Sequence, residues 1–307
     1  MKIITEQNIS YIEPAAITIG TFDGVHLGHR KVLKQLRLNA KRIGAHSVVI
    51  SFKNHPRKVI NPDYDIKFLN TLDEKISLIG KQGIDYIFLI EFNKKMANLS
   101  AGEFIEYLRQ FITIKLLVVG YDNRFGKNRE SNFQIINELS KKYNFDVVYV
   151  YPLYINSENI SSTKIREALQ NGDIAKANIY LGYKYFIKGE VIEGLKIGTK
   201  IGFPTANIKV PAEKLLPKFG VYATITEIDG VPYWSMTNIG YKPTISREFE
   251  PTVETHIFNF SEKIYGKKIT IKFFRYIRDE KRFVSIEQLR VQLQRDKEEV
   301  MQVLINS

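Results

Sequence analysis

Glycine and histidine residues are concentrated in the string Gly20-Thr-Phe-Asp-Gly-Val-His-Leu-Gly-His29, which follows a short apolar run at Ala15–Gly20. Glycines let a backbone pass close to a phosphate group, and the start of a helix favours negative charge. His26 and His29 are three residues apart, so both side chains can face one ligand. A single histidine is more often a satisfied structural group. Metal binding is the other alternative, but no convincing third ligand accompanies the pair.

Hydroxyl and cationic side chains occur together in a second string, Ser161-Ser-Thr-Lys-Ile-Arg166, which precedes an apolar helix face. Hydroxyls at the start of a helix usually serve as caps. The same hydroxyls, together with Lys164 and Arg166, can also bind phosphate groups. A third string, Gly120-Tyr-Asp-Asn-Arg-Phe-Gly126, follows a predicted strand and is either a plain turn or a binding loop.

The second half of the chain contains a glycine-rich segment. Gly189-Glu-Val-Ile-Glu-Gly194 is followed by Gly198-Thr-Lys-Ile-Gly-Phe-Pro-Thr-Ala-Asn207. This pattern predicts a strand that runs into a glycine-rich loop with a polar Thr/Asn pair, and an ordinary barrel turn is the alternative. Glu254 lies in a later predicted strand, where a lone glutamate usually faces solvent.

The elements that must position these residues alternate in type over the first 182 residues. Apolar runs predict strands at 15–20, 47–52, 86–90, 116–120 and 146–149, and helical spacing predicts helices at 29–43, 71–82, 100–111, 133–143, 163–169 and 174–181. Thr71-Leu-Asp-Glu74 and Ser100-Ala-Gly-Glu103 have the form of capping boxes. We therefore expect an α/β domain with a Rossmann-like parallel sheet, whose ligands bind at the carboxyl ends of the strands.

Short strands replace this alternation from about residue 183. They are predicted at 185–192, 221–228, 231–238, 253–260 and 268–276, with the hairpin signal Asp229-Gly230 between two of them. This succession predicts a small antiparallel β-barrel. A last helix, at 285–304, has an apolar stripe that is expected to pack on the barrel: Ile286, Leu289, Leu293, Val300 and Leu304. We thus expect two domains, 1–182 and 183–307.

The composition is that of an ordinary globular protein. The 307 residues are 44% hydrophobic and 25% charged and include no cysteine, which excludes a disulfide-stapled domain and thiol catalysis. No apolar run approaches the roughly 20 residues of a membrane span, and the start has no apolar signal core, so a cytoplasmic protein is expected. The net charge of +12 is spread over the chain. It suits phosphorylated metabolites, nucleotides or nucleic acid, or is simply a basic soluble surface.

The strings of the first half resemble signatures of a known superfamily. Residues 20–29 resemble the HxGH signature of the nucleotidyltransferases, and residues 161–166 resemble the ISSTxxR-like string of the same superfamily. With the loop at 120–126, they are similar to the N-terminal module of the bacterial bifunctional riboflavin kinase/FAD synthetases. That family's usual loop is closer to GxDFRFG, and Asn123 replaces its aromatic residue.

This resemblance implies the site of the first domain. His26 and His29 would be catalytic and stabilise the triphosphate while an adenylyl group moves. The implied nucleotide- and phosphate-binding residues are Gly20, Phe22, Asp23, Gly24, Gly28, Ser161, Ser162, Thr163 and Arg166. The implied flavin-binding residues are Phe52, Pro56, Asp122, Arg124 and Phe125.

The second half resembles the riboflavin kinase signature GxxxGxxxGFPTAN. This likeness implies that Thr205 and Asn207 act near Mg²⁺ and the ATP phosphates, and that Glu254 is the catalytic base for the riboflavin 5′-hydroxyl. Thr199 stands where many family members have arginine. The implied phosphate-binding residues are Gly189, Gly194, Gly198, Gly202 and Pro204, and the implied flavin-binding residues are Asn238, Arg278 and Phe283.

The activity implied by the resemblance is flavin cofactor synthesis in two steps. Riboflavin is phosphorylated by ATP to FMN, and FMN is then adenylylated by a second ATP to FAD with release of pyrophosphate. The expected cofactor is Mg²⁺, and the expected partners are ATP, riboflavin, FMN and FAD, with neither nucleic acid nor membrane, while self-association is left open. Two alternatives remain at this point: an enzyme with only one of the two activities, and a nucleic-acid-binding regulator motivated by the charge.

Overall fold

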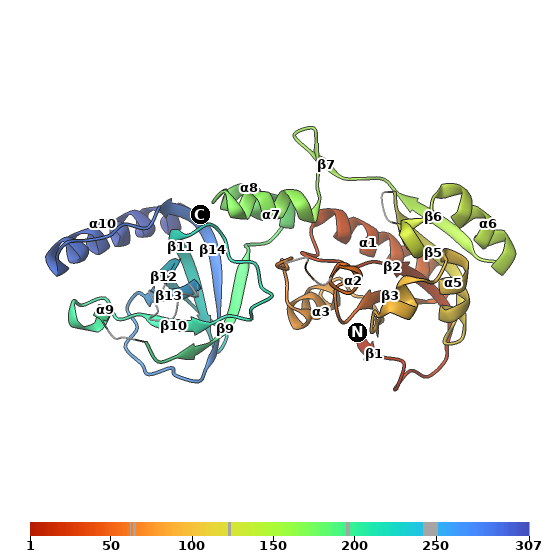
Figure 1. Cartoon of the computed structure of the whole chain (residues 1–307), viewed down its shortest axis with the longest axis horizontal. Helices are drawn as coiled ribbons and strands as arrows, with labels where there is room; N and C mark the ends of the chain where they lie inside the picture. Colours follow the sequence, from red (N-terminus) through yellow and green to blue (C-terminus); the bar gives the residue numbers. More distant parts are fainter. Residues whose placement is uncertain (62, 64–65, 122–123, 195–196, 242–250, 307) are drawn as a thin grey trace. The chain divides into compact units, whose positions relative to one another are not determined.

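The computed structural model describes residues 1–307 except 62, 64–65, 122–123, 195–196, 242–250 and 307. The chain divides into two compact units, Met1–Ser162 and Thr163–Ser307 (Figure 1).

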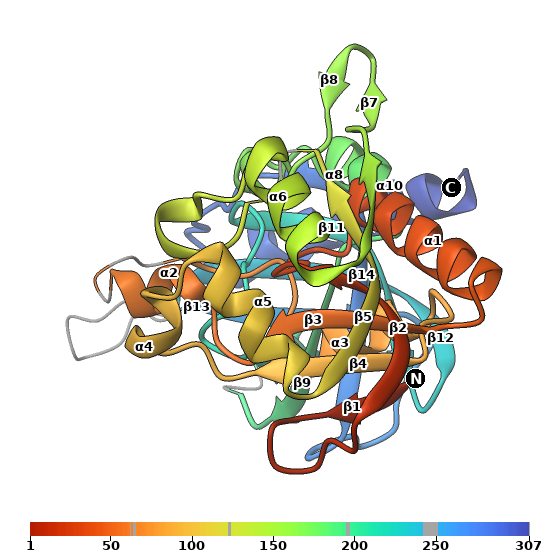
Figure 2. The same cartoon turned by 90° about the vertical axis from the view of Figure 1, so that its right-hand side faces the viewer.

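Strands and helices alternate through the first unit. In chain order they are β1 (Lys2–Ile4), β2 (Ile12–Ile19), α1 (Leu27–Arg42), β3 (His46–Phe52), α2 (Pro56–Ile60), α3 (Leu72–Gly80), β4 (Tyr86–Ile90), α4 (Lys94–Ala97), α5 (Ala101–Arg109), β5 (Ile112–Gly120), the 3-10 turn η1 (Lys127–Arg129), α6 (Phe133–Tyr143), β6 (Asp146–Val150), β7 (Tyr154–Ile155) and β8 (Glu158–Asn159). The last two strands form a small hairpin that projects from the unit (Figure 2).

Six of these strands form one parallel sheet in the order β1-β4-β3-β2-β5-β6, so the expected fold class is confirmed. The chain moves outward from β2 through β3 to β4 and then crosses back to place β5 on the other side of β2. The carboxyl end of β2 is therefore the point where the strand order reverses. Ligands of such sheets bind outside the carboxyl ends of the strands at this point.

Local sequence signals explain where the helices begin. Thr71 and Glu74 form a reciprocal capping box before α3, in which each side chain accepts a hydrogen bond from the other residue's backbone N–H. Ser100 and Glu103 do the same before α5, as the sequence predicts. Buried side chains of α5 then pack in the same apolar core as strand residues such as Ile17.

The second unit begins with two helices and continues as a barrel. Its elements are α7 (Ser162–Gln170), whose first residue closes the first unit, then α8 (Ile174–Leu181), β9 (Phe186–Ile192), α9 (Ile197–Lys200), β10 (Ala206–Lys209), β11 (Gly220–Ile228), β12 (Val231–Tyr241), β13 (Pro251–Ile257), β14 (Lys268–Arg278) and α10 (Ile286–Ile305). The six strands close in the order β10-β13-β12-β11-β14-β9, and every neighbouring pair is antiparallel (Figure 1). The expected barrel is confirmed.

The two helices before the barrel belong to its compact unit. The Asn178 side chain donates to the carbonyl oxygen of Phe273 at 2.9 Å and accepts from the backbone N–H of Tyr185 at 2.6 Å. The boundary between the compact units therefore lies between residues 162 and 163. In the sequence, the change from alternating strands and helices to successive strands lies near residue 183. The functional division at 182/183 stays a prediction.

Between β11 and β12 lies the predicted hairpin turn. Asp229 and Gly230 both have positive φ, 49° and 85°, and Ile228 pairs with Val231. Two successive positive φ values are the requirement of the two-residue turn that matches the twist of paired strands.

Hydroxyl side chains fill part of the barrel interior. Thr224, Thr226, Ser235, Thr237 and Thr255 are fully buried and come from three adjacent strands. Their oxygens hydrogen-bond to one another at 2.8 to 3.4 Å. Since a hydroxyl both donates and accepts, the network satisfies these buried polar groups and ties β11, β12 and β13 together.

The terminal helix α10 packs on the barrel with its apolar stripe, as predicted. Val300 and Leu304 share a core with Ala223 and Met236 of the strands. The prediction is wrong for one residue of the stripe: Ile286, in the first turn of the helix, is exposed.

A buried ion pair also holds α10. Asp296 is 1% exposed, and Arg278, at the end of β14, donates to both of its carboxylate oxygens at 2.8 and 2.6 Å. Arg278 also donates to the carbonyl oxygen of Asp279 at 2.9 Å. The guanidinium of a residue predicted to bind flavin thus also fixes the helix against the barrel.

We predict that Asp296→Ala destabilises the second unit, because Arg278 keeps its charge and loses its partner. Breaking a buried pair in this way costs about 3–5 kcal/mol. Calorimetry should show a lower melting temperature for the barrel transition, by about 10 °C. Glu299→Ala, an exposed acidic change on the same helix, is the control. Equal melting temperatures for the two variants would contradict the assignment.

Candidate active sites

The glycine- and histidine-containing loop joins β2 to α1 at the reversal point of the sheet. Phe22 and Val25 have positive φ, 51° and 35°, in addition to Gly24 at 86°. Positive φ at a bulky or β-branched residue is strained and persists only where the surrounding structure enforces it. The loop is therefore held in one defined shape at the edge of the sheet where ligands bind.

The two histidines are brought together as predicted. Their rings stack with centroids 3.6 Å apart, and Nδ1 of His26 accepts from the backbone N–H of His29 at 3.3 Å, which caps α1. A Cβ on Gly28 would lie 3.2 Å from the His26 ring, so glycine allows this close approach. The Phe22 ring meets His29 edge-on, and Phe22 also packs beside Gly20.

His29 occupies an environment that disfavours a positive charge. Its Nδ1 is buried and has no hydrogen-bond partner within the described part of the chain. Burial, and then the neighbouring His26, lower its pKa well below the ordinary value. The imidazole is neutral at pH 7 and still offers one N–H donor to an anion.

Asp23 connects this loop to two other segments. Its carboxylate oxygens accept from the backbone N–H groups of Leu69 and Asn70, both at 3.2 Å, and its carbonyl oxygen accepts from the Ser162 hydroxyl at 2.9 Å. Asp23 is almost fully buried. Ser161 directly precedes α7, and Thr163 and Arg166 lie on its first turns in the second compact unit.

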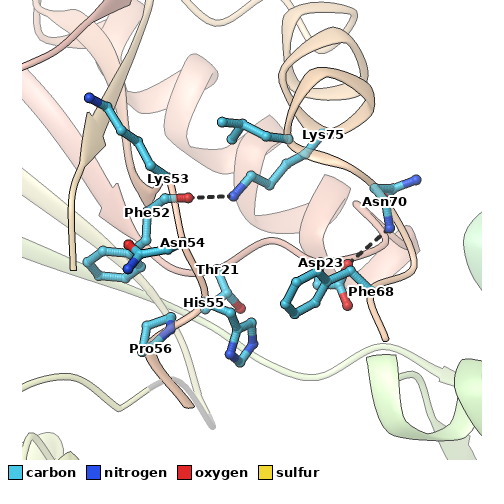
Figure 3. Close-up of a pocket in the computed structure, with 11 residues that line it drawn as sticks. Thr21, Asp23, Phe52, Lys53, Asn54, His55, Pro56, Phe68, Asn70 and Lys75 are labelled. Atoms are coloured by element: carbon cyan, nitrogen blue, oxygen red, sulfur yellow. Dashed lines mark hydrogen bonds between the residues drawn. The ribbon is translucent and has the colours of Figure 1, made fainter. Parts of the chain in front are cut away.

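A pocket adjoins the loop in the first unit (Figure 3). Phe52 and Pro56, two of the predicted flavin-binding residues, line it. The His55 ring caps α2 and stacks on Phe68 with centroids 5.2 Å apart. The whole lining is Thr21, Asp23, Phe52, Lys53, Asn54, His55, Pro56, Phe68, Asn70, Leu72 and Lys75. Of these, the polar residues on and before α3 were missed by sequence reasoning, because their pattern is that of an ordinary capped helix.

The other predicted flavin-binding residues of this unit lie elsewhere or are not described. Phe125 is buried in the apolar core near Phe104, and the Arg124 guanidinium donates to the carbonyl oxygen of Ser131 at 2.9 Å. Neither lines the pocket. Asp122, and the departure at Asn123, lie outside the described residues.

In the barrel, four of the predicted site residues lie in one row across the strands. Asn207 of β10 pairs with Glu254 of β13, which pairs with Asn238 of β12. Asn238 pairs in turn with Val221 of β11, which pairs with Arg278 of β14. Directly opposed residues of neighbouring strands project to the same face, so the row gathers residues from five strands.

A second pocket lies over this row, between the barrel and α10. Its lining is Gly198, Ile201, Phe203, Thr205, Val221, Met236, Thr237, Asn238, Glu254, His256, Arg278, Glu280, Lys281, Phe283, Leu289 and Leu293. Six of the predicted site residues are among them. Leu289 and Leu293 come from α10, so the helix forms an apolar wall opposite the polar row.

Polar contacts connect the row to the glycine-rich segment. The Thr205 hydroxyl donates to a carboxylate oxygen of Glu254 at 3.2 Å. A Cβ on Gly194 would lie 2.0 Å from the Asn207 amide nitrogen, so glycine is required for that side chain to lie where it does. The remaining predicted glycines are Gly189 in β9, Gly198 in α9 and Gly202 in the turn after α9.

His256 was not predicted as a site residue although it stands two positions after Glu254. Its Nδ1 lies 2.7 Å from the carbonyl oxygen of Pro204, and its ring meets Phe203 edge-on. Burial lowers its pKa. Because strand residues two apart share a face, the position of Glu254 was the signal that could have found it.

Comparison with known proteins supports both predicted activities. A family model described as FAD synthetase matches residues 8–164, and one described as riboflavin kinase matches residues 181–304. Bifunctional riboflavin kinase/FMN adenylyltransferases are 37% identical in Bacillus subtilis, over 95% of this chain and 93% of the relative, and 33% identical in Escherichia coli, over 92% and 91%. A crystal structure described as a macrolide-efflux protein from Streptococcus pneumoniae superposes with a TM-score of 0.88 at 28% identity, over 96% of this chain and 97% of that one. Among the described residues, no helix has both the length and the apolar character needed to cross a membrane.

The parallel sheet with its histidine loop and the barrel with its polar row define a nucleotidyltransferase-type unit joined to a flavokinase-type unit. The chain belongs to the family of bifunctional riboflavin kinase/FMN adenylyltransferases. It phosphorylates riboflavin to FMN and adenylylates FMN to FAD, as the sequence predicts, and its substrates are ATP and flavins.

We predict that Gly194→Ala lowers FMN formation by about 10²-fold, because the new methyl group displaces the Asn207 amide by an ångström or more. FAD formation from supplied FMN should stay within about twofold of the original rate, since Gly194 lies outside the unit that carries the histidine loop. Chromatography of flavin products separates the two activities. Normal FMN formation would contradict the assigned importance of the Asn207 position.

Proposed function

We propose that the two reactions are divided between the two halves of the chain. Adenylyl transfer to FMN takes place at the histidine loop of residues 1–182, and phosphoryl transfer to riboflavin takes place at the polar row of residues 183–307. The observation that carries this proposal is that each half contains its own complete constellation: the stacked His26 and His29 beside a pocket, and the row that joins Asn207, Glu254 and Asn238.

In the adenylyl transfer, a phosphate oxygen of FMN attacks the α-phosphorus of ATP, and pyrophosphate leaves. The histidines at the start of α1 donate N–H groups to the phosphate oxygens, where the helix end already favours negative charge. Gly20 and Gly24 let the loop backbone come close to the triphosphate. Ser161, Ser162, Thr163 and Arg166 supply further donors in the proposed nucleotide site, and Asp23 holds the loop to Leu69 and Asn70.

In the phosphoryl transfer, the 5′-hydroxyl of riboflavin attacks the γ-phosphorus of ATP, and ADP leaves. Glu254 accepts the hydroxyl proton, or orients the hydroxyl, and Thr205 holds the carboxylate. Gly189, Gly194, Gly198, Gly202 and Pro204 form the proposed phosphate loop. The flavin lies between the polar row and α10, in contact with Asn238, Arg278 and Phe283.

The oxygen donors of the barrel fit a magnesium ion. Mg²⁺ takes oxygen ligands, and in kinases it is held by one or two protein groups together with substrate phosphates and water. Thr205 offers a hydroxyl, Asn207 an amide carbonyl, and both adjoin the Glu254 carboxylate. Thr205 and Asn207 would hold the ion, which would neutralise the charge of the ATP phosphates. The location in the cytoplasm and the absence of a nucleic-acid partner stay predictions from the sequence.

We predict that His29→Ala lowers FAD formation from supplied FMN by about 10²-fold or more, the usual scale for one preorganised donor. His26→Ala should behave similarly, and riboflavin phosphorylation should remain close to the original rate. His46→Ala is the matched control, because His46 is an exposed histidine of the same unit. Normal FAD synthesis in both His26→Ala and His29→Ala would refute the assigned nucleotide site.

We predict that Glu254→Gln impairs riboflavin phosphorylation and spares FAD formation. The substitution keeps the size and reach of the side chain and removes its basic oxygen. FMN formation should fall by about 10²–10⁴-fold, while supplied FMN is still converted to FAD. Glu213→Gln, an exposed change in the same unit, is the control. Paired assays on one purified and folded variant provide the measurement, and normal kinase turnover would show that Glu254 is not the base.

A further inference from the structure

Lys75 occupies an unusual position for a lysine. It lies in the first turn of α3, half-buried, and its side chain lines the pocket beside the histidine loop (Figure 3). Its ammonium group donates to the carbonyl oxygen of Phe52 at 2.9 Å and to the Ser51 hydroxyl at 3.2 Å. It is thus fixed at the carboxyl end of β3, the strand next to β2.

The pocket lining combines two kinds of groups. Aromatic rings come from Phe52 and from the stacked pair of His55 and Phe68. The histidine loop contributes Thr21 and Asp23. The Ser51 hydroxyl that accepts from Lys75 donates in turn to the carbonyl oxygen of Thr21 at 3.4 Å, so the lysine is connected to the loop through Ser51.

The charges around Lys75 leave it available to an anion. The ammonium group has three donors, and two are used by Ser51 and Phe52, with no third acceptor among the described residues. Asp23 favours its positive charge, but burial opposes it more strongly and lowers the pKa to about 8. Both Asp23 oxygens already accept backbone N–H groups. Lys53 and His55 are the other titratable groups of the pocket lining, and Lys53 is exposed.

We propose that Lys75 binds the 5′-phosphate of FMN and so makes the adenylyl transfer site select a phosphorylated flavin. An isoalloxazine ring that packs on these aromatic side chains lies in the same pocket as the histidine loop, where ATP is proposed to bind. Lys75, connected to that loop through Ser51, then binds the ribityl phosphate before it attacks. This inference rests on the proposed function of the first unit.

The test is steady-state FAD formation from supplied FMN by the full chain at saturating ATP. Lys75→Met should raise KM for FMN by about 10- to 100-fold, the range of a charge-assisted hydrogen bond, with little change in kcat because ground state and transition state lose the same contact. Lys75→Arg should restore most of the affinity. Lys81→Met is the matched control and should leave KM unchanged, because Lys81 is an exposed lysine at the end of α3 that does not line the pocket.

The pH dependence separates this role from a purely structural one. Only protonated Lys75 attracts the phosphate dianion, so kcat/KM for FMN should fall as the pH rises through about 8. Lys75→Arg should remove this fall, since arginine stays charged, and Lys75→Met should be low across the range without the inflection.

Three results would overturn the proposal: an unchanged KM for FMN in folded Lys75→Met, a change in KM for ATP alone, or the same alkaline inflection in Lys75→Arg. Riboflavin kinase activity of each variant and its melting curve report on folding. His29→Ala in the same assay tests the proposed function separately from the role of Lys75. Normal FAD formation by this variant would refute the proposed nucleotide site itself.

Discussion

The pairing register of β10, β13 and β12 is the constraint on which the proposed kinase site depends. Glu254 stands opposite Asn207 on one side and Asn238 on the other, so three polar groups from distant parts of the sequence lie side by side. A slip of one residue would turn the set to the opposite face of the strands. The hydroxyl network inside the barrel, which links Thr237 and Thr255 in the adjacent register position, opposes such a slip.

In the first unit, the order of the strands brings distant parts of the sequence together. The loop with His26 and His29 follows β2, and the strand order reverses there, because β3 lies on one side of β2 and β5 on the other. Ligands of such sheets bind at this point, outside the carboxyl ends of the strands. The pocket walls include residues of β3 and α3. Asp23 ties the loop to the segment before α3, and Lys75 ties α3 to β3. Both sites are therefore assembled from segments that are separate in sequence, and in both glycines permit the closest approaches.

Much of this could be predicted from the sequence, and the misses have physical causes. Apolar periodicity and capping boxes predicted the long elements, since these signals are local. The short strand β10 has only four residues and carries too little pattern to be recognised, although Asn207 lies in it. Arg278 was singled out as a flavin-binding residue, but its ion pair with Asp296 was missed, because an acidic residue on a helix such as α10 is expected to face solvent. Lys75 was missed for the same reason, because only tertiary packing brings it to Ser51.

Two basic groups of the proposed adenylyl transfer site have one electrostatic property in common. Burial lowers the pKa of both His29 and Lys75, so each group binds its proton less tightly in the free protein than in water. Polyanionic ATP and FMN oppose that effect, because a nearby negative charge favours the protonated form. Substrate binding and proton binding are then coupled, and each makes the other more favourable. At neutral pH the empty protein thus holds a neutral His29 and a protonated Lys75, and bound phosphates favour the protonated form of both groups.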